Sequence, residues 1–257
     1  MTDPRWTVIT GASSGIGAEM ARLAAARGRS LLLVARRQDR LEDLSRELAR
    51  DGIRIETLVL DLERASAAEE LVRAIEERGI ELDTLVNNAG FGLRGGFATM
   101  PYADQIAMVE LNVTTLTRLC RLVLPGLVAR RRGGIINISS MAAFQPIPFM
   151  AAYAATKAYV LALSEGLHEE VRRHGIVVTA VCPGPTRTEF TIRANLEKSK
   201  LFSTGAMSAV DVARMALDGY EAGRAVVVTG ATNHVLKALS LATPRALIRK
   251  AAGWMQG

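Results

Sequence analysis

The stretch TGASSGIG, Thr10 to Gly17, follows the short apolar run WTVIT at 6–10 and leads into a segment of helical period. A glycine-rich turn between a first strand and a helix lets a pyrophosphate approach the backbone closely, against exposed N–H groups and the positive end of the helix dipole. The glycines stand at 11, 15 and 17, in the spacing G-x-x-x-G-x-G. The stretch could be only a structural turn, but its context favours nucleotide binding.

Around this loop, short apolar runs alternate with longer segments of helical period. The apolar runs lie at 6–10, 30–35, 54–61, 84–87, 134–139, 176–183 and 224–230. The helical segments lie near 15–27, 39–50, 66–78, 102–131, 151–174 and 208–222. This alternation is typical of βαβ units, and strands that are apolar throughout are covered on both faces. The sequence therefore predicts an α/β doubly wound Rossmann fold, with a seven-stranded parallel sheet between helices.

The chain shows no linker, repeat or low-complexity segment, so we expect a single dinucleotide-binding and catalytic domain over 1–257. The connection at about 184–207 has no strong period, and such a segment is often a functional loop, here for substrate. The last segment, 234–257, is basic, apolar on one side and carries Trp254. It could lie on a membrane surface, although packing or an oligomer contact is the favoured interpretation.

The composition argues against several classes of protein. Hydrophobic residues make up 49% of the chain and charged residues 23%, as in a soluble globular protein. The net charge of +6 is scattered among acids, so nucleic-acid binding is not expected. The N-terminus does not resemble a secretory signal, and prolines and polar residues interrupt the uncharged run at 133–156, so no membrane span is predicted. Cys120 and Cys182 fit buried positions in a reducing compartment and have no metal-ligand spacing, so we expect a cytoplasmic protein without a metal.

The end of the second apolar run bears on the choice of dinucleotide. An acid there would bind the ribose 2′-OH of NAD, whereas an arginine accommodates the 2′-phosphate of NADP. The chain has Ala35 where an acid is often found, followed by Arg36 and Arg37. A guanidinium can pair with a phosphate through two hydrogen bonds, so NADP(H) is favoured. NAD(H) stays possible, because Asp39 is near and the arginines could simply begin a solvated helix.

Further motifs follow in a fixed order: NNAG at 87–90, Asn112 in LNVT, NISS at 137–140, YAATK at 153–157 and PGPTRT at 183–188. Ser140 precedes Tyr153 by 13 residues (153 − 140), and Lys157 follows Tyr153 by four (157 − 153). Residues four apart share one face of a helix. Together with the glycine loop, the order and spacing of these motifs resemble the short-chain dehydrogenase/reductase family over almost the whole chain.

The resemblance implies four catalytic residues: Asn112, Ser140, Tyr153 and Lys157. Tyr153 would exchange a proton with the carbonyl or alcohol oxygen, and Ser140 would position that oxygen. Lys157 would lower the pKa of the phenol and hold the nicotinamide ribose. Asn112 would hold a water that links Lys157 to solvent. The cofactor would supply the redox chemistry.

The same resemblance implies the cofactor contacts. Asp61 would contact the adenine, Asn87 and Gly90 the adenosine side, and Thr188 with the Pro183–Gly184 turn the nicotinamide carboxamide. The full expected set is Gly11, Ser13, Ser14, Gly15, Ile16, Gly17, Arg36, Arg37, Asp61, Asn87, Ala89, Gly90, Tyr153, Lys157, Pro183, Gly184 and Thr188. Many relatives that prefer NADP carry a basic residue at the position of Ser14, so specificity would rest on the two arginines.

These motifs predict an NADPH-dependent carbonyl reductase for ketones or oxoacyl compounds, with Tyr153 as proton donor. An NAD-dependent alcohol or hydroxysteroid-type dehydrogenase and a non-catalytic dinucleotide-binding protein are the alternatives. The resemblance also implies a homodimer or homotetramer paired through 102–131 and 151–174, and membrane contact is not expected.

Apolar residues in the segments around the nicotinamide favour a lipophilic substrate, although they could equally be core. They are Phe91, Met141, Phe144, Phe149, Phe190, Leu201, Phe202 and Met207. Nearby cations could instead attract a phosphate-bearing acyl carrier or coenzyme A: Arg94, Arg187, Arg193, Lys198 and Lys200.

Overall fold

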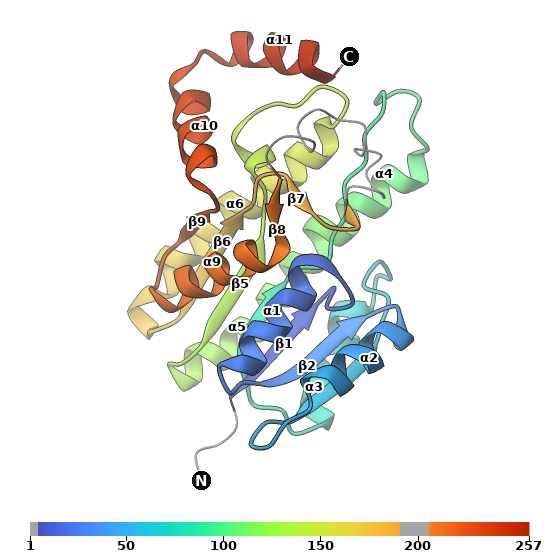
Figure 1. The fold of residues 1–257 in the computed structure, drawn as a ribbon, viewed down its shortest axis with the longest axis vertical. Helices are drawn as coiled ribbons and strands as arrows, with labels where there is room; N and C mark the ends of the chain where they lie inside the picture. The colour runs from blue at the N-terminus through green and yellow to red at the C-terminus, as the bar shows by residue number, and fades with distance from the viewer. Residues whose placement is uncertain (1–4, 191–205, 257) are drawn as a thin grey trace.

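A computed structural model describes residues 5–190 and 206–256, which are built around one parallel sheet (Figure 1). Its strands are β1 (Trp6–Thr10), β2 (Ser30–Ala35), β3 (Ile55–Val59), β4 (Leu82–Asn87), β5 (Gly134–Ile138), β6 (Val177–Cys182) and β9 (Val226–Val228). They lie in the order β3-β2-β1-β4-β5-β6-β9, and every pairing is parallel. The predicted seven-stranded sheet is confirmed. The strand order reverses between β1 and β4, which is where open α/β sheets bind ligands at the carboxyl ends of their strands.

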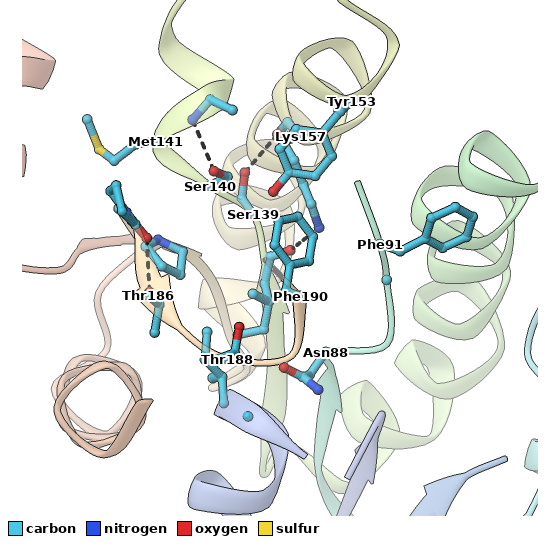
Figure 2. Close-up of a pocket in the computed structure, with 18 of the residues that line it drawn as sticks. Asn88, Phe91, Ser139, Ser140, Met141, Tyr153, Lys157, Thr186, Thr188 and Phe190 are labelled. Atoms are coloured by element: carbon cyan, nitrogen blue, oxygen red, sulfur yellow. Dashed lines mark hydrogen bonds between the residues drawn. The ribbon is translucent and has the colours of Figure 1, made fainter. Parts of the chain in front are cut away.

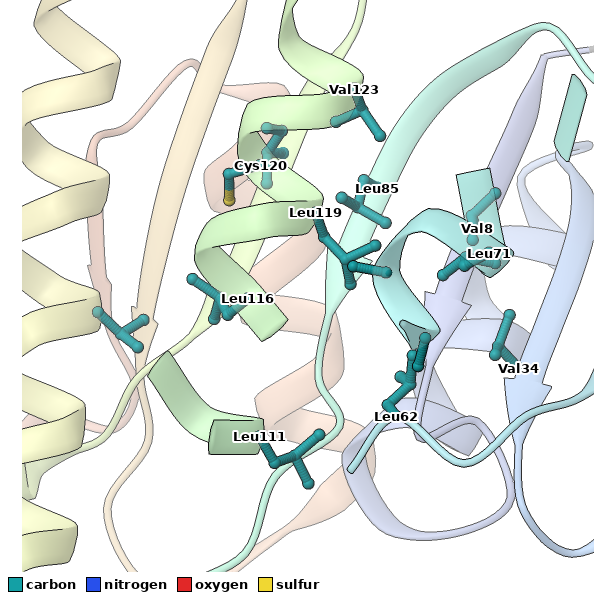
Figure 3. Close-up of a cluster of buried hydrophobic side chains, with 14 of the residues drawn as sticks. Val8, Val34, Leu62, Leu71, Leu85, Leu111, Leu116, Leu119, Cys120 and Val123 are labelled. Atoms are coloured by element: carbon teal, nitrogen blue, oxygen red, sulfur yellow. The ribbon is translucent and has the colours of Figure 1, made fainter. Parts of the chain in front are cut away.

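Helices cover both faces of this sheet. They are α1 (Gly15–Ala26), α2 (Gln38–Leu48), α3 (Ala67–Glu77), α4 (Tyr102–Val109), α5 (Leu116–Arg130), α6 (Ala151–Val171), α9 (Ala209–Glu221), α10 (Ala231–Ala242) and α11 (Arg245–Gln256). Alternate strand residues face opposite layers. Val8 and Leu85 pack with Leu71 of α3 and Leu119 of α5 (Figure 3), whereas Ile9 belongs to the cluster around α1, α2 and α9. The central strands of the sheet are therefore buried on both sides, as their apolar sequences require, and the edge strand β3 is half-buried.

The predicted helix over 102–131 is interrupted by one turn of another geometry. Between α4 and α5, residues Glu110–Thr115 form the π-helical segment η1. Asn112 in this segment accepts a hydrogen bond from the Phe91 N–H at 3.1 Å and donates to the Phe91 carbonyl at 2.9 Å. It also donates to Thr156 Oγ1 of α6 at 3.2 Å. The π turn thus holds the chain after β4 against α6, and such turns are frequent at functional sites.

Two other features lie outside the sequence predictions. A small second sheet pairs β7 (Thr186–Arg187) with β8 (Met207–Ser208) in parallel. Within the predicted loop at 184–207, residues 191–205 lie outside the described part of the chain. After β9 the chain forms α10 and α11, which meet at a corner at the top of Figure 1. In the part of the chain that is described, no helix combines the length and the apolar character needed to cross a membrane.

Candidate active site

A cavity of about 870 Å³ opens at the carboxyl end of the sheet. Residues that follow six successive strands of the sheet line it: Gly11 after β1, Arg36 after β2, Leu60 after β3, Asn88 after β4, Ser139 after β5 and Pro183 after β6. The strand order places these segments side by side. The cavity therefore lies where the strand order reverses, at the carboxyl ends of the strands.

Most residues predicted for catalysis or cofactor binding line this one cavity. They are Gly11, Ser13, Ser14, Gly15, Ile16, Arg36, Arg37, Asp61, Ala89, Gly90, Ser140, Tyr153, Lys157, Pro183, Gly184 and Thr188. Three predicted residues do not line it: Gly17, Asn87 and Asn112. Asn87 is buried within the sheet and donates to Asn137 Oδ1 of the neighbouring strand at 2.9 Å. The side-chain amide of Asn112 is held by Phe91 and Thr156, so the water relay assigned to Asn112 stays a prediction.

The glycine loop is fastened to the end of β4 by a residue that sequence reasoning missed. Asn88 donates from Nδ2 to the carbonyls of Thr10 at 2.9 Å and Gly11 at 3.1 Å. In return, Thr10 Oγ1 accepts from the N–H groups of Asn88 and Ala89, each at 3.0 Å. Gly11 adopts a φ of 65°, in the left-handed region that glycine tolerates. Asn88 is the second residue of the NNAG motif, from which the sequence analysis selected Asn87, so the motif itself was the available signal.

Gly17 acts through packing and not as a wall of the cavity. A Cβ at this position would lie 2.4 Å from Asn88 Nδ2 and 2.5 Å from the Gly11 carbonyl oxygen. We therefore expect Gly17→Ala to displace the loop, to lower stability by about 1–3 kcal/mol and to weaken dinucleotide binding. Thermal melting and cofactor titration check this. Gly166→Ala on α6 is the matched control, because a Cβ there meets nothing within 4 Å and should be neutral or stabilising.

Tyr153 and Lys157 lie one turn apart on α6, facing Ser140 at the end of β5 (Figure 2). Lys157 Nζ donates to the Ile138 carbonyl at 2.9 Å, and Ser139 Oγ donates to the Lys157 carbonyl at 2.7 Å. Ser140 Oγ accepts from the Ala142 N–H at 3.1 Å. These bonds fix α6 against β5. The Tyr153 ring also packs against Phe190, with ring centroids 5.6 Å apart.

The pKa of Tyr153 departs from expectation. Burial raises it to about 12, while a hydrogen bond with Ser140 acts in the opposite direction. Burial also lowers the pKa of Lys157 to about 8, and Lys157 Nζ lies 5.9 Å from the centre of the Tyr153 ring. The expected net lowering of the phenol pKa is therefore wrong for the protein groups alone, because burial is the largest cause of the shift and Ser140 is the group that opposes it. At neutral pH Tyr153 is a protonated phenol that can donate.

The two arginines stand at the cavity, and both are paired with carboxylates. Arg37 Nη1 lies 2.8 Å from Glu189 Oε2, and its guanidinium donates to Ser13 Oγ at 3.0 Å. Arg36 Nη1 lies 3.0 Å from Glu63 Oε1 and 3.8 Å from Asp61 Oδ1. The hydrogen bond from Arg37 lowers the pKa of Glu189. Glu189 was not predicted as a site residue, since its meeting with Arg37 depends on the fold.

The apolar residues predicted around the substrate are only partly brought together. Phe91, Met141 and Phe190 line the cavity. Phe144 does not line it and packs instead under the Lys237 ammonium, 5.0 Å from its ring centre. Phe149 is 46% exposed and Met207 belongs to β8, and neither lines the cavity.

Of the predicted cations, Arg94 and Arg187 do not line the cavity either. The remaining residues predicted for this region lie outside the described part of the chain: Arg193, Lys198, Lys200, Leu201 and Phe202.

Comparison with known proteins identifies the family to which this chain belongs. The family model for short chain dehydrogenase matches residues 5–199. The very-long-chain 3-oxoacyl-CoA reductase of Macaca fascicularis is 35% identical over 182 residues, which cover 69% of this chain and 58% of the relative. Among solved structures, a short-chain dehydrogenase from Sphingobium yanoikuyae in complex with NADPH has a TM-score of 0.80 and 36% identity, over 94% of this chain and 97% of that one.

A bulky-bulky ketone specific alcohol dehydrogenase from Comamonas testosteroni has a TM-score of 0.78 and 31% identity, over 95% of this chain and 97% of that one. The chain belongs to the short-chain dehydrogenase/reductase family, whose members are oxidoreductases acting on the CH–OH/C=O pair. It spans 58% of the length of the curated reductase that it matches.

The residues present fit the nicotinamide dinucleotide that this family uses. Helix α1 begins after Ser14 without a side-chain cap, so its first N–H groups are available to a pyrophosphate. A Cβ on Gly15 would lie 3.0 Å from Thr188 Cγ2, so the loop closely faces a residue expected at the nicotinamide. Arg36 and Arg37 stand where the adenosine ribose is expected.

Proposed function

We propose that this protein reduces a lipophilic carbonyl compound, a ketone or an oxoacyl group, with NADPH as cofactor. The observation that carries the proposal is that Tyr153, Ser140 and Lys157 line one cavity together with apolar side chains such as Phe91, Met141 and Phe190. A buried phenol with its pKa raised to about 12 is a proton donor at neutral pH, as reduction of a carbonyl requires. Two proteins to which this chain is similar, a very-long-chain 3-oxoacyl-CoA reductase and a bulky-bulky ketone specific alcohol dehydrogenase, support the same class.

The cofactor, when bound, supplies the hydride, and the residues of this chain do the rest. Ser140 Oγ and the Tyr153 hydroxyl hydrogen-bond the carbonyl oxygen and orient it. As negative charge develops on that oxygen, Tyr153 releases its proton to it. Lys157 would donate to the ribose of the bound cofactor, and its ammonium would attract the phenolate that Tyr153 leaves behind. Phe91, Met141 and Phe190 exclude water around the reacting group.

Substrate class is tested by a panel assay. We expect turnover of aliphatic and aryl ketones with NADPH and little turnover of small polar polyols with NADP⁺. Oxidation of NADPH followed by absorbance is the measurement. Activity confined to polyols would overturn the lipophilic substrate. Faster turnover of secondary alcohols with NAD⁺ would instead favour the NAD-dependent dehydrogenase.

Preference for NADPH rests on Arg36 and Arg37, and Arg37→Asp tests it. Loss of a charge-assisted pair with the 2′-phosphate should weaken NADPH binding by about 10- to 100-fold and leave NADH binding little changed. Tryptophan-quenching titrations with both cofactors measure this, and Arg36→Asp should act in the same direction. Arg46→Asp, on the exposed end of α2 away from the cavity, is the matched control. Equal losses for the two cofactors would contradict the role of the 2′-phosphate.

A substitution of Glu189 provides a second test of whether Arg37 binds the 2′-phosphate. Its carboxylate holds Arg37 at 2.8 Å, so a 2′-phosphate at the same guanidinium must compete with it. We expect Glu189→Gln to tighten NADPH binding and to leave NADH binding unchanged, since NADH has no group that competes. Weaker NADPH binding in this variant would mean that Glu189 supports the arginine and does not compete for it.

A further inference from the structure

The helices α10 and α11 turn an apolar face into the cavity that contains Tyr153. Leu236 and Leu239 of α10, and Leu247, Ile248 and Ala252 of α11, line this cavity. Three of these side chains keep a large exposed surface: Leu236 49%, Leu239 57% and Leu247 59%. Exposed apolar side chains gathered on one wall of a cavity mark a binding surface.

Charge separates this wall from the rest of the cavity. The adenosine side carries Arg36, Arg37, Asp61, Glu63 and Glu189. By contrast, the cations of α10 and α11 in the described part of the chain do not line the cavity: Lys237, Arg245, Arg249 and Lys250. The polar groups that α10 and the corner contribute to the wall are Asn233, Ser240 and Thr243. No cation on this wall could pair with a phosphate, whereas a hydrocarbon bound to the wall would be removed from contact with water.

The position of the wall fixes which part of a substrate reaches it. α10 packs beside η2 (Met141–Phe144), the short helix that directly follows Ser140. In Figure 1 the connection from β5 to α6, which carries Ser140, lies between the glycine loop and the two C-terminal helices. A carbonyl held by Ser140 and Tyr153 can therefore extend a substituent away from the cofactor and along α10.

We propose that α10 and α11 form the binding site for an unbranched aliphatic tail of the substrate. The proposal rests on the proposed carbonyl reduction and names its substrate class: long-chain ketones or oxoacyl compounds whose tail lies along Leu236 and Leu239 and reaches Leu247 and Ile248. The corner at Thr243–Pro244 bends the wall, which suits a chain that turns about its single bonds better than a rigid ring system.

The size of the wall sets the expected chain length. From Leu236 to Thr243 the helix rises about 10 Å, at about 1.5 Å per residue. An extended chain with carbon–carbon bonds of about 1.5 Å covers that distance with about eight methylene groups. Each methylene group that is buried against this wall should raise the affinity for the substrate by about two- to fourfold.

A series of 2-alkanones from butanone to dodecanone tests the site, with NADPH and the full chain. We expect kcat/KM to rise with each added methylene and then to level off. In the double variant Leu236→Ser with Leu239→Ser, the ratio of kcat/KM for 2-dodecanone to that for 2-butanone should fall by about tenfold or more. Val235→Ser is the matched control, since Val235 is 59% exposed on the same helix but does not line the cavity. It should leave the ratio unchanged.

Binding of 1-dodecanol and 1-butanol in the presence of NADP⁺, measured by calorimetry, gives a readout that needs no turnover. Tighter binding of the long alcohol, lost in the double variant, supports the tail site. Values of kcat/KM that do not depend on chain length would overturn the tail site. Equal losses of kcat/KM for all ketones in the double variant would do the same. Either result would leave the proposal of carbonyl reduction intact. If no ketone is reduced, carbonyl reduction fails, and the calorimetry alone decides the tail site.

Discussion

Tyr153→Phe is expected to lower kcat/KM for carbonyl reduction by roughly 10³-fold, within the range that a positioned general acid contributes. The substitution removes only the hydroxyl that donates the proton. The ring that packs against Phe190 remains, so folding and NADPH affinity should change little. Steady-state rates, a cofactor titration and a thermal melt, run on one preparation, separate these effects.

Tyr220→Phe supplies the matched control for this substitution. Burial also raises the pKa of Tyr220 to about 12, and its hydroxyl hydrogen-bonds Thr84 Oγ1 at 3.1 Å. Tyr220 does not line the cavity, so its replacement should alter stability but not the chemical step. Near-normal turnover by Tyr153→Phe would exclude Tyr153 as the proton donor.

Lys157→Met is expected to reduce kcat by about 10²-fold or more and to weaken cofactor binding, because it removes an ammonium one helical turn from the phenol that would also donate to the ribose. Its effect on stability depends on pH. Burial lowers the pKa of Lys157 from 10.5 to about 8, so below pH 8 the folded protein holds a buried charge at a cost of about 3 kcal/mol.

The sign of the pH dependence follows from proton counts. Between about pH 8 and 10.5, the unfolded chain keeps a proton on Lys157 that the folded protein has lost. The free energy of unfolding of the wild type should therefore rise with pH in this window relative to that of Lys157→Met, and level off above it. Denaturant titrations of both proteins from pH 7 to 10 measure the difference. A constant difference across that range would show that Lys157 is not buried as a charge.

The sequence predicts the sheet well because its signals are local. The central apolar runs, such as 30–35, are buried on both faces of the sheet, so their positions as strands follow from the pattern alone, whereas the edge strand β3 is only half-buried. Cys120 and Cys182, expected to be buried, are 2% and 0% exposed. The catalytic motif is also local in sequence, because Ser140 follows β5 and both Tyr153 and Lys157 lie on the next long helix, α6.

What the sequence could not predict depends on residues that meet only in the fold. Glu189 and Arg37 are 152 residues apart, and the sequence around either residue does not predict their ion pair. Asn88 binds a loop 78 residues earlier in the chain. The sign of the change in the Tyr153 pKa depends on how deeply the phenol is buried, which spacing does not show. Likewise, the apolar side of 234–257 could be seen in the sequence, but not the cavity that it faces.

The π turn at Glu110–Thr115 has a consequence for insertions and deletions. A π turn accommodates one residue more than an α-helix of the same length, so the faces of α4 and α5 are offset by about 100° from those of one continuous α-helix. Removing a single residue from this segment would allow regular α-helical bonding while rotating Asn112 away from Phe91. The shortest possible deletion in this helix would thus make its backbone more regular and break the hydrogen bonds that tie the chain after β4 to α6.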